Sequence, residues 1–118
     1  MVEMKKFILL VLAVLTLTSC SKPLPADKLS YVGEWESKEM YLLIHQDGTV
    51  VYERVQDGGS TSINAPLKEF IGDDFVVGVA FLTSNFDVTE APHLVGDEWV
   101  MVVDGVRLTK NQGYQILL

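Results

Sequence analysis

Two Asp-Gly dipeptides, each set between short apolar runs, constrain the fold of this chain more than any other feature. Asp47-Gly48 separates residues 41–46 from residues 49–55, and Asp104-Gly105 follows the run that begins at Trp99. Asp-Gly favours the type I′ turn, whose twist suits a two-residue β-hairpin. The sequence therefore predicts two antiparallel hairpins, one in each half of the chain.

Each predicted hairpin implies a register of facing residues. In the first hairpin, the expected pairs are Ile44 with Val51, Leu43 with Tyr52, and Tyr41 with Arg54. In the second, the expected pairs are Trp99 with Lys110, Met101 with Leu108, and Val103 with Val106. The first hairpin would then be partly apolar on both faces, whereas one face of the second is clearly core.

The remaining apolar runs extend the β pattern. Residues 75–82 are apolar throughout, with Gly78 inside, which predicts a strand buried on both faces or strongly curved, with a bulge or close backbone approach at the glycine. A turn is expected at Gly72-Asp73, a short strand at residues 86–88 and a closing strand at residues 114–118. About seven strands at this spacing predict an all-β domain, a small antiparallel meander β-barrel, with a β-sandwich as the alternative.

The amino-terminal segment has the features of a secretory signal. Lys5 and Lys6 precede an uncharged apolar run at residues 7–17, which is too short to span a bilayer. The tetrapeptide Leu17-Thr18-Ser19-Cys20 contains the only cysteine of the chain and resembles a bacterial lipobox. We expect cleavage of a signal peptide at residues 1–19 and lipidation of Cys20 by diacylglycerol and palmitate-type acyl chains, which anchor a protein stably to a membrane.

The same resemblance, extended to enterobacterial lipoproteins, implies a destination. An aspartate after the cysteine retains such proteins in the inner membrane, and this chain has Ser21, so an outer-membrane lipoprotein facing the periplasm is expected. Residues 20–30 contain Pro23 and Pro25 without an apolar period and are interpreted as a tether, followed by one domain at residues 31–118.

The charge of the mature chain argues against two classes of partner. The precursor has 9 Lys and Arg against 16 Asp and Glu; removing Lys5, Lys6 and Glu3 leaves 7 against 15, a net charge of −8. Nucleic acids and anionic lipid surfaces select for Lys and Arg, so neither is expected to bind by charge. The membrane is expected as a partner only through the lipid at Cys20.

The segment YVGEWES contains a Gly-x-Trp motif, Gly33-Glu34-Trp35, and resembles the opening motif of the lipocalins and related calycins. The resemblance implies that Trp35 closes one end of a barrel and that a basic side chain, Arg107, stacks on it. The segments DGTVVYERVQDGGSTSINAPLKEFIGDDFVVG and WVMVVDGVRLTK resemble a group of small, uncharacterised bacterial lipoproteins. That likeness implies a lipoprotein with a β domain and brings no activity with it.

Catalytic and metal sites are not expected. Ser60, Thr61 and Ser62 lie in the polar segment at residues 58–66, which predicts a mobile or partner-contacting loop. Their hydroxyls would need a base for nucleophilic catalysis, and the only histidines are His45, in the first hairpin, and His93, in a Pro-containing loop. Neither the histidines nor the acidic pairs have metal-ligand spacing, so no metal and no cofactor is predicted.

The aromatic residues allow two interpretations, a filled core or the lining of a ligand cavity, and the small size of the domain favours a core for most of them. Trp35, Tyr41 and Tyr52 are candidate contacts for a ligand or partner, with Ser60, Thr61, Ser62 and Arg107. The leading hypothesis is a non-catalytic, lipid-anchored accessory lipoprotein that contacts another envelope protein. The alternative is a lipocalin-like carrier of a small apolar ligand, which requires a cavity above about 300 Å³.

Overall fold

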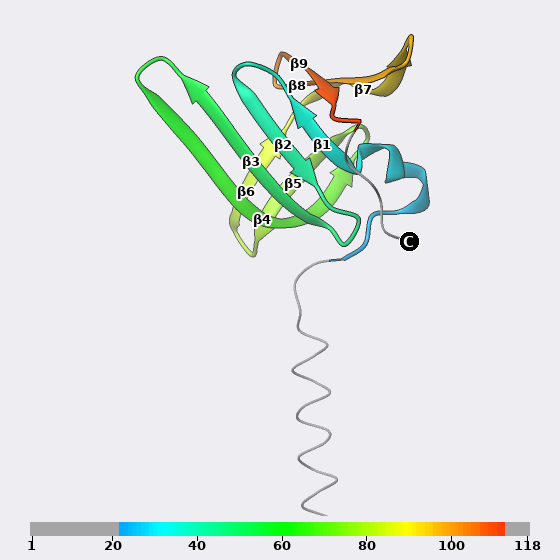
Figure 1. The fold of residues 1–118 in the computed structure, drawn as a ribbon. Helices are drawn as coiled ribbons and strands as arrows, with labels where there is room; N and C mark the ends of the chain where they lie inside the picture. The colour runs from blue at the N-terminus through cyan, green and yellow to red at the C-terminus, as the bar shows by residue number, and fades with distance from the viewer. Residues whose placement is uncertain (1–21, 113–118) are drawn as a thin grey trace, which may run out of the picture.

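The structure is a computed structural model that describes residues 22–112. Nine antiparallel strands form one sheet in the order β6-β5-β4-β3-β2-β1-β9-β8-β7 (Figure 1). Each strand pairs with the next one along the chain except β6 and β7, which are the two edges, and β1 also pairs with β9. A short 3-10 helix, η1 (Ala26–Tyr31), precedes them. The strands are β1 (Gly33–Glu36), β2 (Met40–Ile44), β3 (Thr49–Gln56), β4 (Gly59–Ile71), β5 (Asp74–Val79), β6 (Leu82–Phe86), β7 (Val88–Val95), β8 (Glu98–Val103) and β9 (Val106–Lys110).

The sheet curls into a half-barrel, which confirms the predicted all-β, antiparallel meander fold (Figure 1). A single curled sheet takes the place of the two packed sheets that a sandwich would need. The edge strands β6 and β7 do not pair with each other within the described residues. Hydrogen bonds accepted by two aspartate side chains connect this part of the molecule instead. Asp74 Oδ1 accepts a hydrogen bond from Val88 N at 2.6 Å, and Asp104 Oδ1 accepts one from Asp87 N at 2.9 Å.

Two of the three pairs expected in the second hairpin are confirmed, and the β8–β9 ladder ends at Val100 with Thr109, before Trp99 and Lys110. Val103 pairs with Val106 and Met101 with Leu108 across the β8–β9 turn. Asp104 and Gly105 both have positive φ, 48° and 78°, as a type I′ turn requires.

The register expected for the first hairpin is wrong by one residue. Ile44 pairs with Val50, Leu43 with Val51 and Leu42 with Tyr52. The cause is a three-residue loop, in which Gly48, at φ 94°, donates from N to His45 O at 3.0 Å and leaves Thr49 opposite His45. With this register the buried residues of the two strands share one face: Met40, Leu42, Ile44, Val50 and Tyr52.

The apolar run at residues 75–82 forms two strands rather than one buried strand. Phe75, Val76 and Val77 are buried in β5, whereas Phe81 and Leu82 lie exposed at the turn into β6. The close approach expected at Gly78 is confirmed, because its φ is 136° and an added Cβ would overlap the carbonyl oxygen of Leu82. The turn at Gly72-Asp73 is also as predicted. Residues 86–88 are not a strand of their own: β6 ends at Phe86 and β7 begins at Val88.

Aromatic side chains fill the concave side of the sheet. Phe86 stacks on Phe75 with ring centroids 4.9 Å apart. Tyr52 contacts Phe86 edge-on, also with ring centroids 4.9 Å apart. Trp35, Leu42, Met101 and Leu108 are fully buried in the same cluster. Most of the aromatic set therefore serves as core, with Phe81 as the clear exception.

The amino-terminal part of the described chain packs on the domain from Leu24 onward. Leu24 is buried and donates from N to Gln46 O at 3.2 Å, and η1 brings the buried Tyr31 against Phe70. Much of the segment interpreted as a tether therefore belongs to the packed domain. The predicted signal peptide, Cys20 and the predicted strand at residues 114–118 lie outside the described residues.

Candidate functional site

The candidate contact residues Trp35 and Tyr52 belong to the core. Trp35 has no exposed surface, and its Nε1 donates to Tyr31 O at 2.9 Å. Tyr52 is only 6% exposed. Both side chains support the half-barrel from inside, so neither presents a surface to a partner.

The basic residue that stacks on Trp35 is Lys110, so the expectation for Arg107 is wrong. Arg107 is exposed, because it alternates with the buried Val106 and Leu108 on β9. Lys110 Nζ lies 4.8 Å from the ring centroid of Trp35 and 5.0 Å from that of Trp99, and it donates to Ser30 O at 2.9 Å. A cation between two aromatic faces is attracted by both rings.

The sequence contained one signal for this role of Lys110, because the predicted hairpin register set Lys110 opposite Trp99. The structure also explains the glycine of the Gly-x-Trp motif, because a Cβ at Gly33 would come within 3.0 Å of the Lys110 side chain. The glycine of the motif thus leaves room for the lysine stem, while burial lowers the pKa of the Lys110 ammonium from its ordinary value.

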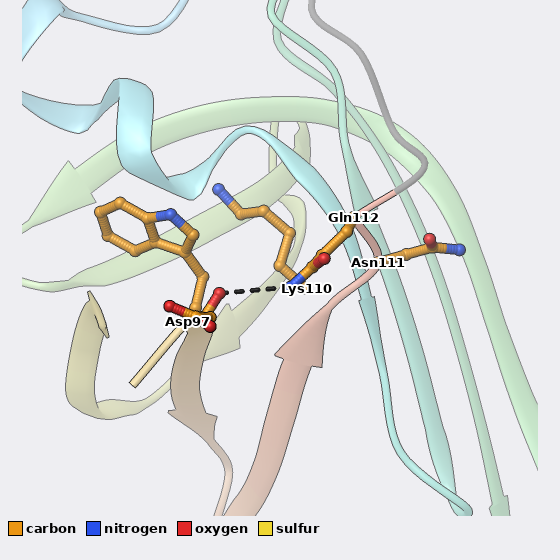
Figure 2. Close-up of a pocket in the computed structure, with 5 residues that line it drawn as sticks. Asp97, Lys110, Asn111 and Gln112 are labelled. Atoms are coloured by element: carbon orange, nitrogen blue, oxygen red, sulfur yellow. Dashed lines mark hydrogen bonds between the residues drawn. The ribbon is translucent and has the colours of Figure 1, made fainter. Parts of the chain in front are cut away.

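A surface depression of about 480 Å³ lies beside Trp99 and Lys110. Its other lining residues are Asp97, Asn111 and Gln112, none of which was a candidate from the sequence. Gln112 Nε2 donates to Asp97 O at 3.2 Å, and the Asn111 side chain points away from this pair (Figure 2). An aromatic wall, an ammonium and an amide could hold a small polar or aromatic group here.

Tyr41 takes part in a polar cluster across the first two strands. Its hydroxyl donates to Glu34 Oε2 at 2.9 Å, while Asn111 Nδ2 donates to Glu34 Oε1 at 2.7 Å. These hydrogen bonds lower the pKa of the Glu34 carboxyl, and partial burial together with that carboxylate raises the pKa of Tyr41 to about 12. The cluster fixes the end of β9 to β1 and gives Tyr41 a structural role.

Ser60, Thr61 and Ser62 lie on β4, so the loop expected at residues 58–66 is wrong. They are exposed and pair with Val55, Arg54 and Glu53 of β3. His93 likewise lies on β7 rather than in a loop, with its Nε2 3.6 Å from Glu90 Oε1. The β3–β4 ladder therefore sets no histidine opposite the three hydroxyls.

Residues 22–112 contain no group of three or more His, Cys, Asp or Glu side chains that could hold a metal ion. In the same residues, no helix has the length and apolar character needed to cross a bilayer. No family model, curated protein or solved structure matches this chain.

Proposed function

We propose that this chain is a lipid-anchored, non-catalytic accessory lipoprotein of the bacterial envelope, and that it holds an extended segment of a partner protein. The leader at residues 1–19 directs export, and acylated Cys20 attaches the domain to the outer membrane on its periplasmic side. The basic start, the apolar run and the lipobox-like tetrapeptide support this part of the proposal.

The observation that carries the partner-binding part is a free strand edge. β4 pairs with β3 over residues 59–66, but it pairs with β5 only from Leu67 onward. Within the described residues, no strand covers the outer side of β4 between Gly59 and Pro66. We call this segment the β4 edge.

The hydrogen-bond pattern identifies the amides that the β4 edge offers. Leu67 donates from N to Gly48 O at 2.7 Å, toward the β3 side. Amides of an antiparallel strand alternate between its two sides, so the N–H groups of Ser60, Ser62 and Asn64 point away from β3. An added strand could pair with these three residues, as in β-strand addition.

The side chains along the β4 edge suit reversible binding. Ser60, Thr61, Ser62 and Asn64 are exposed and uncharged. Main-chain hydrogen bonds would supply most of the affinity for a strand added at this edge. The net charge of −8 of the mature chain favours a partner segment rich in Lys or Arg.

The test combines an edge-blocking substitution with crosslinking in living cells. A photoreactive amino acid replaces Thr61 in the full-length lipoprotein, alone and with Ser62→Pro or the matched control Ser62→Ala. Proline removes the outward N–H of residue 62 without removing a β3–β4 hydrogen bond. We expect one specific adduct, kept with Ser62→Ala and lost with Ser62→Pro. An adduct that survives Ser62→Pro, or no adduct at all, would refute binding at the β4 edge.

The depression beside Trp99 favours a second candidate function, the carriage of a small ligand. Its volume exceeds the lower bound of about 300 Å³ for ligand pockets, although its lining is polar on one side. Native mass spectrometry of the periplasmic Cys20→Ser protein tests this function. An added mass that Trp99→Ala abolishes would support it, and an unliganded mass would count against it.

A further inference from the structure

The turn between β5 and β6 exposes a cluster of apolar side chains, which we call the apolar tip. Phe81 is 88% exposed, Leu82 69% and Val79 46%. Transfer of apolar side chains from water to an apolar environment is favourable, so solvent exposure of adjacent Phe and Leu side chains is unfavourable. Contiguous exposed apolar residues mark a contact surface more often than single ones do.

The apolar tip lies at the end of the domain where the described chain begins (Figure 1). Lys22 and the turn residues Val79 and Ala80 line the same surface depression of about 300 Å³. The backbone of Lys22 also packs against the β2–β3 turn, since an added Cβ at Gly48 would overlap the Lys22 carbonyl oxygen. The start of the packed chain and the apolar tip are thus neighbours.

Cys20 precedes Lys22 by two residues, which can span at most about 7 Å. An acyl chain on Cys20 therefore places the bilayer surface next to this end of the domain. Such a short connection keeps this end of the domain close to the membrane.

We propose that the apolar tip inserts into the bilayer that holds the acyl chains of Cys20. This inference rests on the proposed acylation. Phe81 and Leu82 enter the interface, and the flanking ammonium groups of Lys22 and Lys68 face lipid phosphates. Lys68 is fixed at the tip, because its Nζ donates to Ala80 O at 2.9 Å. Lysines flanking an apolar segment commonly place their charge at the level of the headgroups.

The acidic charge of the mature chain is compatible with this insertion. A net charge of −8 does not attract an anionic surface, so the tip alone would bind membranes weakly. The acyl chains supply the attachment, and the tip then adds apolar contact at high effective concentration. The acyl chains therefore bring the domain to the membrane, and the tip determines how the domain is oriented there.

The test uses the acylated mature protein in vesicles of phosphatidylethanolamine and phosphatidylglycerol that contain a spin-labelled lipid. With Cys20 acylated, Thr83→Cys provides a single reactive thiol for a fluorophore next to the tip, and Asp57→Cys provides a matched label at the β3–β4 turn. We expect spin-labelled lipid to quench the label at residue 83 several-fold more than the label at residue 57. Phe81→Ser with Leu82→Ser should reduce this quenching to the level at residue 57, whereas Leu94→Ser with Val95→Ser, an exposed pair elsewhere, should leave it unchanged.

The outcomes separate the insertion from the acylation. Equal quenching at residues 83 and 57, with mass spectrometry showing an acylated Cys20, would overturn the insertion alone. An amino-terminal peptide without acyl mass, together with protein in the soluble periplasmic fraction, would overturn both. Quenching that persists after Phe81→Ser and Leu82→Ser would show that the domain approaches the lipid without using its tip, and would also refute the inference.

Discussion

At the scale of single residues, Lys110 joins three parts of the chain through one side chain. Its ammonium lies between the rings of Trp35 on β1 and Trp99 on β8, and it donates to the carbonyl of Ser30 at the end of η1. A partly desolvated cation–π contact contributes up to about 2 kcal/mol, and a hydrogen bond from a charged group about 1.5–3 kcal/mol. Both contributions are offset by the cost of burying the charge.

Replacing Lys110 with methionine keeps the apolar stem and removes the charge. We expect Lys110→Met to lower the free energy of unfolding by about 1–2 kcal/mol. Arg107→Met, on the exposed face of the same strand, should change it by less than about 0.5 kcal/mol. Urea unfolding of the two variants measures both values. Equal effects at the two positions would contradict the role given to Lys110.

At the same scale, the Tyr31 hydroxyl makes the free energy of unfolding depend on pH. Burial, with the nearby charges of Asp73 and Asp74, raises the pKa of its hydroxyl from 10.0 to about 12. Between pH 10 and 12 the unfolded chain releases this proton while the folded chain keeps it, so the stability present below pH 10 declines as the pH rises.

Tyr31→Phe removes this titration together with the hydrogen bond to Asp73 O. At pH 8 we expect the variant to be less stable than the parent by about 1 kcal/mol, because a hydrogen bond is lost. The difference should shrink between pH 10 and 11, since only the parent loses stability through residue 31. Unfolding free energies at pH 8, 10 and 11 provide the measurement, and a constant difference would be inconsistent with the raised pKa.

At the scale of elements, the β5–β6 hairpin depends on Gly78. The backbone at this position has φ 136°, and the carbonyl of Leu82 occupies the space of a side chain. We expect Gly78→Ala to cost about 3 kcal/mol or more, because the clash adds to the backbone strain. Gly59→Ala is the control, since open space surrounds its Cβ position and its φ is not positive. Thermal unfolding should show a large decrease in Tm for the first variant only.

The sequence predicts the register of the second hairpin correctly and that of the first hairpin with an error of one residue. The error has a physical cause. Asp-Gly fits a two-residue loop and also a three-residue loop with glycine in a left-handed conformation. Local sequence does not decide between them; burial of Leu42, Ile44, Val50 and Tyr52 on one face does. The polar segment at residues 58–66 similarly favours a loop by its composition. Residues 59–66 form a strand because they pair with β3, which is a tertiary effect.

The candidate site was harder to predict than the fold. Arg107 fits the stacking role by residue type alone, whereas alternation along β9 turns its side chain outward and that of Lys110 inward. Asp97 and Gln112 come together through the β8–β9 pairing and one side-chain hydrogen bond, so no local motif marks them. Register errors of one residue reverse the face of every side chain, which is why sites on strands need the structure.

At the scale of the whole molecule, the packed domain begins before the first strand. Leu24 is 7% exposed, although it lies in the segment interpreted as a tether. We expect Leu24→Ala to lower the free energy of unfolding by about 2–3 kcal/mol. Leu29→Ala, at a more exposed leucine of the same segment, should cost less than about 1 kcal/mol. Equal urea midpoints for the two variants would mean that Leu24 is not part of the core.

The two proposed surfaces lie at different ends of the domain. The β3–β4 turn, where the β4 edge begins, is at the opposite end from the start of the described chain and from the β5–β6 turn (Figure 1). A domain oriented by the tip would therefore present residues 59–62 away from the bilayer. That arrangement is consistent with a partner segment reaching the β4 edge from the periplasm.

Pro66 has a consequence for assembly. Free strand edges allow identical chains to add to one another without limit, which is the route to fibrils. At the β4 edge, Pro66 offers no N–H, and the turn at residues 57–58 ends the other side, so only a short ladder can form. If two copies paired through this segment, neither would have outward backbone groups left at its β4 edge for a third copy. Such pairing would close as a symmetric dimer, and polymerisation along β4 would stop there.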